Sequence, residues 1–207
     1  ACKFFAKKSI LYIPGIGLGL WIMHGVFLSR NWEKDKDSIA KAFERQRKLV
    51  GHPLWMTTYP ESTRLSPEKK IVSHRFSEKL GLPKWEHVLV PRTKGFVAQI
   101  EGLRDVVPAV YDLTIAYGGS DGEGPTPLDL GAGAYNNPIC IHCKRFEMKD
   151  LPVDKEELKQ WLFNRWQEKE ILLEYFSKHK AFPGDRNPDQ FSVTPVWWGE
   201  KKIEKTE

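Results

Sequence analysis

Apolar residues recur along this chain with two different spacings, which predict helices in some segments and strands in others. Residues 37–50 place Ile39 and Phe43 on one side of a helix and basic residues on the opposite side. Residues 67–80 form a second predicted helix, which a proline opens and a glycine followed by a proline closes. Residues 95–104 form a third helical stretch.

The longest predicted helix lies near the end of the chain. Asp154 is followed three positions later by Glu157, which is the pattern of a capping box at a helix start. Apolar residues then continue at helical spacing, at Leu158, Trp161, Leu162, Leu172, Leu173 and Phe176. The tail after this helix is polar, and we expect it to be loosely ordered.

Short apolar or alternating runs predict strands at residues 54–59, 88–90, 107–116 and 139–146. Helices separate most of these strands, and that alternation is typical of an α/β layer on mostly parallel strands. We therefore predict an α/β fold, with a mostly parallel or mixed sheet flanked by helices and a C-terminal strand–helix extension. Residues 118–137 are rich in Gly, Pro and Asp and predict an exposed loop.

Residues 10–28 are apolar and nearly as long as the roughly 20 residues that a membrane span requires. Pro14, His24 and several glycines interrupt the run. Three interpretations stay open, namely a re-entrant or interfacial element, a buried hairpin and a true span. Nothing later in the sequence is expected to cross a membrane.

The net charge of +5 and the pI near 9.0 favour anionic partners, such as phospholipid headgroups, coenzyme A or nucleic acid. A nucleic-acid binder needs a patterned basic face with stacking aromatic residues. Here the basic residues are spread out and matched by acids, and most tryptophans fall in apolar runs. We therefore expect no nucleic-acid partner.

The three cysteines are too few for a disulfide scaffold. Cys140 and Cys143 form a C-x-x-C pattern inside an alternating strand-like run, and no second pair completes a zinc site. We interpret them as buried thiols on a strand and expect no metal.

Two short segments, residues 25–30 and 59–64, each end in an arginine after a strand-like or apolar run. The planar guanidinium suits a phosphate because it donates two parallel hydrogen bonds to phosphate oxygens. Thr63 adds a hydroxyl donor, and Glu61 can orient the arginine or accept a substrate hydroxyl. The alternative is a surface Glu–Arg pair without any ligand.

The order and spacing of these segments resemble the second and third sequence blocks of the glycerolipid acyltransferase family, which includes the lysophosphatidate acyltransferases. The second block in that family is a glycine, two or three apolar residues and an arginine, and the third is Pro-Glu-Gly-Thr-Arg. Residues 107–111 are similar to the fourth block, an apolar-Pro-apolar strand. Residues 88–96 are similar to a run of the eukaryotic, endoplasmic-reticulum branch.

The later part of the chain is similar to the C-terminal extension of that branch, so that the resemblance covers residues 8–183. It implies four segments: an acyltransferase core lacking its first block, an exposed loop, an acyltransferase C-terminal extension and a polar tail. Their bounds are residues 1–117, 118–137, 138–183 and 184–207.

The family's chemistry gives these residues their implied roles. A histidine takes the proton from a glycerol hydroxyl, an aspartate five residues later orients that histidine, and the activated oxygen attacks the acyl-CoA thioester. Carried over by position, the residues that would bind the acceptor phosphate are Gly25, Arg30, Glu61, Ser62, Thr63 and Arg64.

On the other side of the site, the resemblance implies that Val107 and Pro108 help to shape the acyl or coenzyme A side. Arg92 and Lys94 are basic and follow a strand end, so that either a coenzyme A phosphate contact or a structural ion pair is open to them.

The sequence departs from the family pattern at the catalytic histidine. The first block, Asn-His-x-x-x-x-Asp, is absent. Of the six histidines only His142 has an acid five positions later, Glu147, and a strand is the wrong setting for that pair. We interpret His142 as structural. Acid–base help is worth roughly a hundred- to ten-thousand-fold in rate, so we predict an N-terminally truncated chain that does not transfer acyl groups alone.

A second departure is Ser62, which stands where the family has glycine. If the backbone there needs a positive φ, serine costs roughly 1 kcal/mol or more. Otherwise the serine is harmless and adds a donor.

The resemblance implies an enzyme that transfers an acyl group from acyl-CoA to a lysophospholipid, with lysophosphatidate the favoured acceptor and phosphatidate the product. A non-catalytic relative that binds phospholipid or acyl-CoA at a membrane surface is the alternative. We expect no cofactor beyond acyl-CoA as co-substrate, membrane lipids as partners, and a location at the endoplasmic reticulum or another intracellular membrane.

Overall fold

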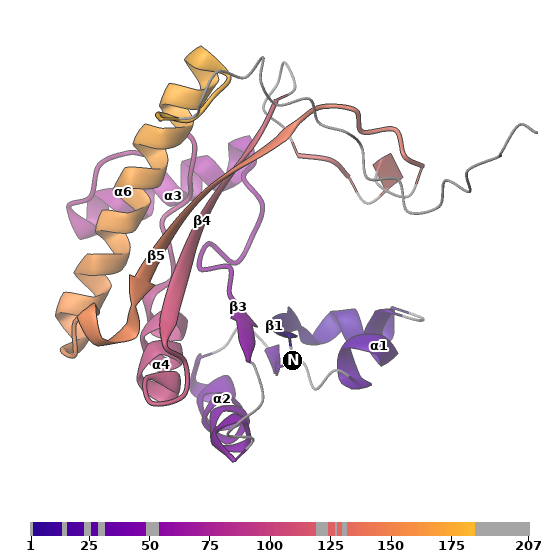
Figure 1. Cartoon of the computed structure of the whole chain (residues 1–207), viewed down its shortest axis with the longest axis vertical. Coiled ribbons are helices and arrows are strands. Elements are labelled where there is room, and N and C mark those ends of the chain that lie inside the picture. Colours follow the sequence, from indigo (N-terminus) through magenta and orange to yellow (C-terminus); the bar gives the residue numbers. More distant parts are fainter. Residues whose placement is uncertain are drawn as a thin grey trace, which may run out of the picture.

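The computed structural model describes most of the chain, namely residues 2–13, 16–22, 26–28, 32–48, 54–118, 124–126, 128–129 and 132–184. Its elements form an α/β arrangement in which helices flank two small sheets (Figure 1). The predicted α/β class with mixed strand directions is confirmed.

The N-terminal half contains a parallel sheet of three short strands in the order β2-β1-β3. These strands are β1 (Cys2–Lys7), β2 (Val26–Leu28) and β3 (Trp55–Thr57). Between them the chain forms the 3₁₀ helix η1 (Lys8–Tyr12) and the helices α1 (Ile16–Ile22) and α2 (Trp32–Arg47). Parallel neighbouring strands require a crossover connection, because the chain has to return to the end of the sheet at which the previous strand began.

The C-terminal half contains an antiparallel pair of long strands, β4 (Ala109–Tyr117) and β5 (Ile139–Glu147). Ala109 lies opposite Glu147, and Tyr117 lies opposite Ile139. A second 3₁₀ helix, η2 (Met148–Asp150), follows β5 and leads to the long helix α6 (Lys155–His179). This helix runs along the pair (Figure 1), so the predicted strand–helix extension is present.

Two more helices, α3 (Pro67–Leu80) and α4 (Thr93–Leu103), link the two halves. The main core lies where α4, α6 and the extended segment 85–90 meet, and Leu158 and Leu162 are almost fully buried there. The other buried members are Trp85, Val88, Val90, Phe96, Val97, Ile100, Met148, Leu151 and Trp166. A smaller cluster of Ile39, Phe43 and Leu103 joins α2 to α4.

Local capping explains why α3 and α6 begin and end where the sequence indicates. Ser66 accepts a hydrogen bond from the Lys69 amide at the start of α3, and Gly81 closes that helix in the left-handed conformation with φ 67°. At the start of α6, Asp154 accepts from the amides of Glu156 and Glu157 at 2.8 and 3.1 Å.

Three expectations about elements need correction. Residues 88–90 are buried as predicted but form no strand, because the Val90 amide donates to the Ser73 side chain and not to a neighbouring strand. The helix predicted at 37–50 begins earlier, at Trp32. The apolar run 10–28 is divided among η1, α1 and β2.

None of the helices in the described parts of the chain is both long and apolar enough to span a bilayer.

Candidate functional site

The segment that follows β3 is a tight turn built by its own backbone. The Ser62 amide donates to the Tyr59 carbonyl at 2.9 Å, and Ser62 has φ 59°, in the left-handed region. The Pro60 carbonyl accepts from the Arg92 amide at 2.9 Å and from the Ser62 hydroxyl at 3.4 Å. The turn of residues 60–64 is therefore joined directly to the start of α4.

Glu61 points into the protein and does not pair with Arg64. Its carboxylate accepts a hydrogen bond from the indole Nε1 of Trp166 at 3.1 Å and another from the backbone amide of Leu89. Burial raises the pKa of Glu61 above its usual value, against the lowering effect of these two bonds and of nearby Lys169. The interpretation of Glu61 as half of a surface Glu–Arg pair is wrong, and the carboxylate instead fixes the turn from within.

The other predicted binding side chains of this region face outward. Arg64, Arg92 and Lys94 are exposed, and none of them forms an ion pair with a residue that the structure describes. The structural ion pair considered for Arg92 and Lys94 is thus not found among the described residues. Thr63, between Ser62 and Arg64, is exposed as well.

The start of α4 adds to the positive potential beside the turn. Arg92 stands at the N-cap position, and its side chain makes no capping hydrogen bond to this helix. A helix N-terminus carries a partial positive charge and unpaired N–H donors, which favour an anion. The turn and the helix start therefore present arginines and amide donors together.

Val107 and Pro108 follow the C-terminal end of α4, whereas Arg92 and Lys94 lie at its N-terminal end. The helix has 11 residues, which corresponds to about 16 Å at 1.5 Å per residue. Val107 packs against the core clusters, and the Pro108 carbonyl accepts from the Met148 amide at 2.8 Å. An open depression of about 300 Å³ lies beside them, lined also by Arg104, Asp105 and Lys149. The Arg92 amide thus bonds the turn at Pro60, at the other end of α4 from Val107.

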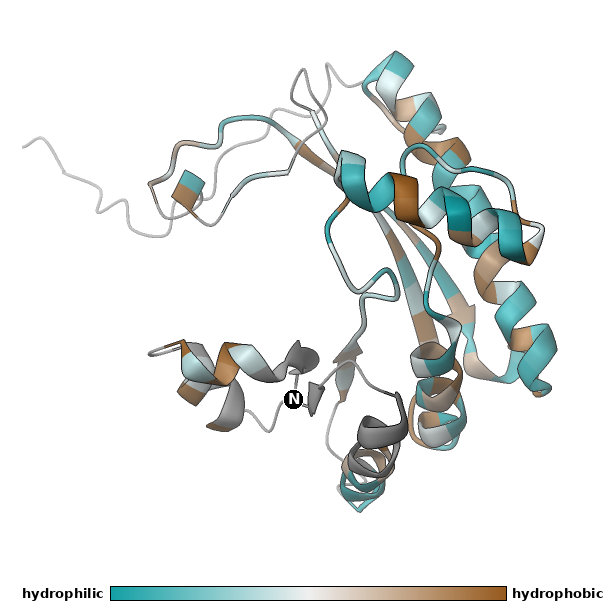
Figure 2. Ribbon diagram, turned by 180° about the vertical axis from the view of Figure 1, so that it is seen from behind, coloured by the Kyte–Doolittle hydropathy of each residue, from teal (hydrophilic) through white to brown (hydrophobic). Residues whose placement is uncertain are grey.

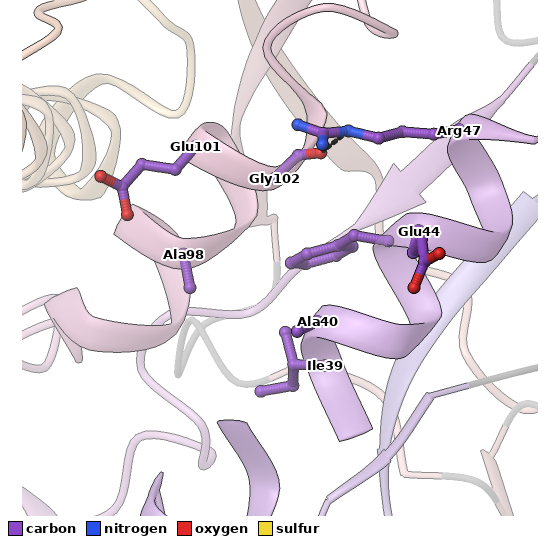
Figure 3. A pocket seen from close by; sticks show the side chains of 8 residues that line it. Ile39, Ala40, Glu44, Arg47, Ala98, Glu101 and Gly102 are labelled. Carbon is purple, nitrogen blue, oxygen red and sulfur yellow. Dashed lines mark hydrogen bonds between the residues drawn. The ribbon is translucent and has the colours of Figure 1, made fainter. Parts of the chain in front are cut away.

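A second depression, of about 260 Å³, lies between α2 and α4 (Figure 3). Arg47 donates from Nε to the Gly102 carbonyl at 3.0 Å, and Glu44 and Glu101 carry acidic groups at its rim. The close packing here depends on Gly102, since a Cβ at that position would lie 2.3 Å from the Phe43 ring. None of the predicted site residues lines this depression, and its two carboxylates do not suit a phosphate.

The remaining predictions concern residues of other kinds. Gly25 and Arg30 lie outside the described residues, as do most of the polar tail and part of the 118–137 loop.

Cys140 is half-buried but Cys143 is exposed, so the expectation of two buried thiols is wrong for Cys143. The His142 ring contacts Phe182, with the centroids 5.6 Å apart. No group of three His, Cys, Asp or Glu side chains that could hold a metal occurs in the described part of the chain.

Sequence reasoning missed the polar residues of α6 that join this helix to β4, to residues 86–87 and to the turn. Lys169 donates to the Leu113 carbonyl at 2.7 Å and pairs with Asp112 at 2.5 Å, while Glu170 accepts from the amides of Glu86 and His87. Trp166 supplies the indole donor to Glu61. The available signal was the composition of α6, whose charged residues at 165, 169 and 170 fall at helical spacing on the side of its apolar positions.

Comparisons with known proteins give a consistent result. The family model described as "Acyltransferase" matches residues 1–117, and the one described as "Acyltransferase C-terminus" matches residues 135–199. No solved structure matches the chain.

Individual relatives are similar over most of this chain. The "1-acyl-sn-glycerol-3-phosphate acyltransferase gamma" of Homo sapiens is 36% identical over 187 residues, which are 89% of this chain and 48% of that relative. The delta protein of Mus musculus is 35% identical over 181 residues, covering 87% of this chain and 47% of its own length. "1-acyl-sn-glycerol-3-phosphate acyltransferase 2" of Arabidopsis thaliana is 33% identical, with 87% and 46% covered. The chain spans about half the length of the curated relatives it matches.

Proposed function

Since the chain belongs to the acyltransferase family, we propose that it serves the transfer of an acyl group from acyl-CoA to lysophosphatidate, which yields phosphatidate. The relatives' names specify a 1-acyl-glycerol 3-phosphate as acceptor. In this reaction a glycerol hydroxyl oxygen attacks the thioester carbonyl, the carbon–sulfur bond breaks, coenzyme A leaves as a thiol, and a general base takes the hydroxyl proton.

The acceptor phosphate binds at the turn of residues 60–64. One observation supports this assignment most strongly, namely the hydrogen bond from the Arg92 amide to the Pro60 carbonyl, which joins the turn to the uncapped start of α4. Arg64 supplies the bidentate donor and Thr63 a hydroxyl, while Arg92 and the helix start add positive potential. A phosphate dianion is the ligand that best matches this set of donors.

Glu61 is the internal support of this site, because its carboxylate is held by Trp166 and Leu89. Gly25 and Arg30 complete the acceptor site in our proposal. Val107 and Pro108 belong to the acyl side, and the exposed Lys94 is available to a coenzyme A phosphate in our proposal. No cofactor is required besides acyl-CoA as co-substrate, and we place the reaction at the endoplasmic reticulum or another intracellular membrane because acceptor and product are lipids.

The 207 residues lack the Asn-His-x-x-x-x-Asp block that supplies the general base in this family. We therefore propose that these residues bind the acceptor without turning it over. Measurable acyl transfer by the chain that depends on one of its six histidines would contradict this part of the proposal.

The acceptor site can be tested with a soluble headgroup, glycerol 3-phosphate, titrated into the chain and followed by calorimetry. Arg64→Gln should weaken binding about tenfold or more, because a hydrogen-bonded charge partner of the phosphate is lost. Arg75→Gln is the matched control, since Arg75 is an exposed arginine on α3 outside the turn. Equal affinity of the parent and the Arg64→Gln variant would contradict the assignment.

A further inference from the structure

Helix α3 turns its apolar side chains away from the protein. Ile71, Val72, Phe76 and Leu80 have exposed fractions of 56%, 61%, 47% and 46%, whereas its buried residues are Ser73 and Ser77. A surface helix of a globular protein ordinarily has the opposite arrangement. Figure 2 shows α3 on the outside of the molecule, in front of the strands and α6, with a brown hydrophobic band across it.

Polar contacts of Ser73 and His74 join the inner side of α3 to residues 85–90. The Ser73 hydroxyl accepts from the Val90 amide at 2.8 Å, and the Ser77 hydroxyl donates to the Ser73 carbonyl at 3.1 Å. His74 Nε2 lies 2.8 Å from the Trp85 carbonyl. Four apolar side chains facing solvent are therefore unexplained by packing within the described residues.

Basic side chains stand among these apolar ones. Lys69, Arg75 and Lys79 are exposed, and none of them forms an ion pair with a described residue. Their neighbours behave differently, because Lys70 pairs with Glu86 at 3.1 Å and Lys84 with Glu78 at 2.6 Å. The acidic residue of the first turn, Glu68, bonds the Ser66 hydroxyl at 2.7 Å.

We propose that this outer face of α3 docks on an anionic lipid surface, with Val72, Phe76 and Leu80 entering the interface and Lys69, Arg75 and Lys79 contacting the headgroups. Apolar residues interleaved with lysine and arginine on an exposed helix are typical of interfacial binding. A protein partner fits less well, because the buried centres of protein interfaces are depleted in lysine.

The position of α3 connects this docking to the acceptor site, and that connection rests on the proposed function. The helix begins three residues after Arg64, and the exposed side chains of Tyr59 (66%) and Leu65 (45%) extend the apolar surface on either side of the turn. A lipid surface in contact with α3 therefore lies next to the phosphate-binding turn. Only the headgroup of the acceptor would then have to leave the membrane, while its acyl chain stays in the lipid.

Co-sedimentation of the whole chain with vesicles tests the docking. The vesicles contain phosphatidylcholine alone or with added phosphatidylserine. Val72→Ser with Phe76→Ser should reduce binding about tenfold, because two apolar side chains no longer enter the interface. The matched control exchanges two exposed apolar residues elsewhere, Val153→Ser with Ile171→Ser, and should bind as the parent does.

A second variant tests the charge component and does not alter apolar surface. This variant combines Lys69→Gln, Arg75→Gln and Lys79→Gln. It should lose the preference for anionic vesicles, with affinity for them falling about fivefold for each charge removed. Circular dichroism checks that each variant is folded, and should the serine variant not fold, this second variant decides the proposal. Parental binding by the folded variants, or a loss of self-association in place of a loss of vesicle binding, would overturn the proposal.

The two proposals fail separately in these experiments. The α3 serine variant should keep the parental affinity for glycerol 3-phosphate, while Arg64→Gln should keep vesicle binding. Both proposals are supported if the α3 serine variant loses vesicle binding and Arg64→Gln weakens the binding of glycerol 3-phosphate. A vesicle result as expected beside an unaffected Arg64→Gln titration contradicts the phosphate site alone.

Discussion

Ser62 occupies a backbone conformation that a side chain makes costly. Its φ of 59° is in the left-handed region, where a Cβ approaches the following carbonyl oxygen. From the sequence, a cost at Ser62 was expected only if the backbone there has a positive φ. The structure shows that it does. The Ser62 hydroxyl offsets part of the cost through its contact with the Pro60 carbonyl at 3.4 Å.

Ser62→Gly should therefore raise the free energy of unfolding by about 1 kcal/mol, since glycine adopts this conformation without strain. Urea denaturation followed by circular dichroism measures the change. Lys180→Gly is the matched control, because Lys180 is another non-glycine residue with a positive φ, 58°, at the end of α6. A decrease in stability for Ser62→Gly would show that the hydroxyl contact outweighs the strain.

The burial of Glu61 predicts a pH dependence of stability. Burial raises its pKa, so the folded state holds the proton more tightly than the unfolded state does, and stability falls as pH rises from the usual value near 4.5 through the raised pKa. Glu61→Gln keeps an acceptor for Trp166 and removes this titration. The advantage of the variant over the parent in free energy of unfolding should therefore grow with pH.

Urea unfolding of both proteins between about pH 3 and 8 measures that difference. Glu174→Gln is the control of opposite sign, because the hydrogen bond from Lys178 lowers the pKa of Glu174 and its contribution is lost as pH falls. A difference between the Glu61→Gln variant and the parent that does not change with pH would contradict the buried titration.

The motif at residues 60–64 was readable from the sequence, but the direction of its side chains was not. Local spacing reports the residue types of a turn. The left-handed backbone at Ser62 was only one of two possibilities, and it was raised by the glycine that the resembling family has at this position. The partner of Glu61 is Trp166, which lies 105 positions later, and no local pattern connects the two. The same holds for Arg92, whose link to the turn is a backbone bond.

Among the elements, helix ends were predicted well because their causes are local. Ser66, Gly81 and Asp154 each act within a few residues of the end that they define. Residues 88–90 were misassigned as a strand because burial alone produces the same apolar run, while strand pairing depends on a neighbour. The antiparallel pairing of β4 and β5 could not be predicted from the local sequence either.

Helix α6 reaches back to the acceptor turn through one indole. Trp166→Phe removes the Nε1–H donor and leaves the half-buried Glu61 carboxylate with fewer hydrogen bonds. We expect a loss of about 1–3 kcal/mol in free energy of unfolding, the usual cost of an unmet buried polar group. Denaturation of the variant measures it.

Trp85→Phe is the matched control, because it also removes an indole donor but from the neutral Gln167 side chain, at 2.8 Å. Its loss should be smaller, since hydrogen bonds to charged groups are stronger. In a Glu61→Gln background, Trp166→Phe should cost less than it does alone. Additive effects of the two changes would rule out the coupling.

At the scale of the whole molecule, the sequence predicted the α/β class but not how the strands divide. The parallel sheet and the β4–β5 pair are separate hydrogen-bonded units. Residues 2–7 were not predicted as a strand, because only pairing with β2 and β3 stabilises them in that form. Leu54, Met56 and Val107 pack against the same buried cluster between α2 and α4, and a pattern along the chain does not reveal such shared packing.

The bond between Trp166 and Glu61 also bears on how such proteins change over generations. The two family models match residues 1–117 and 135–199, so a break in the gene between them would leave each matched segment whole. Yet the indole of the second segment supports the carboxylate of the first. Recombination that paired the first segment with a counterpart lacking this tryptophan would leave the Glu61 carboxylate without its indole donor.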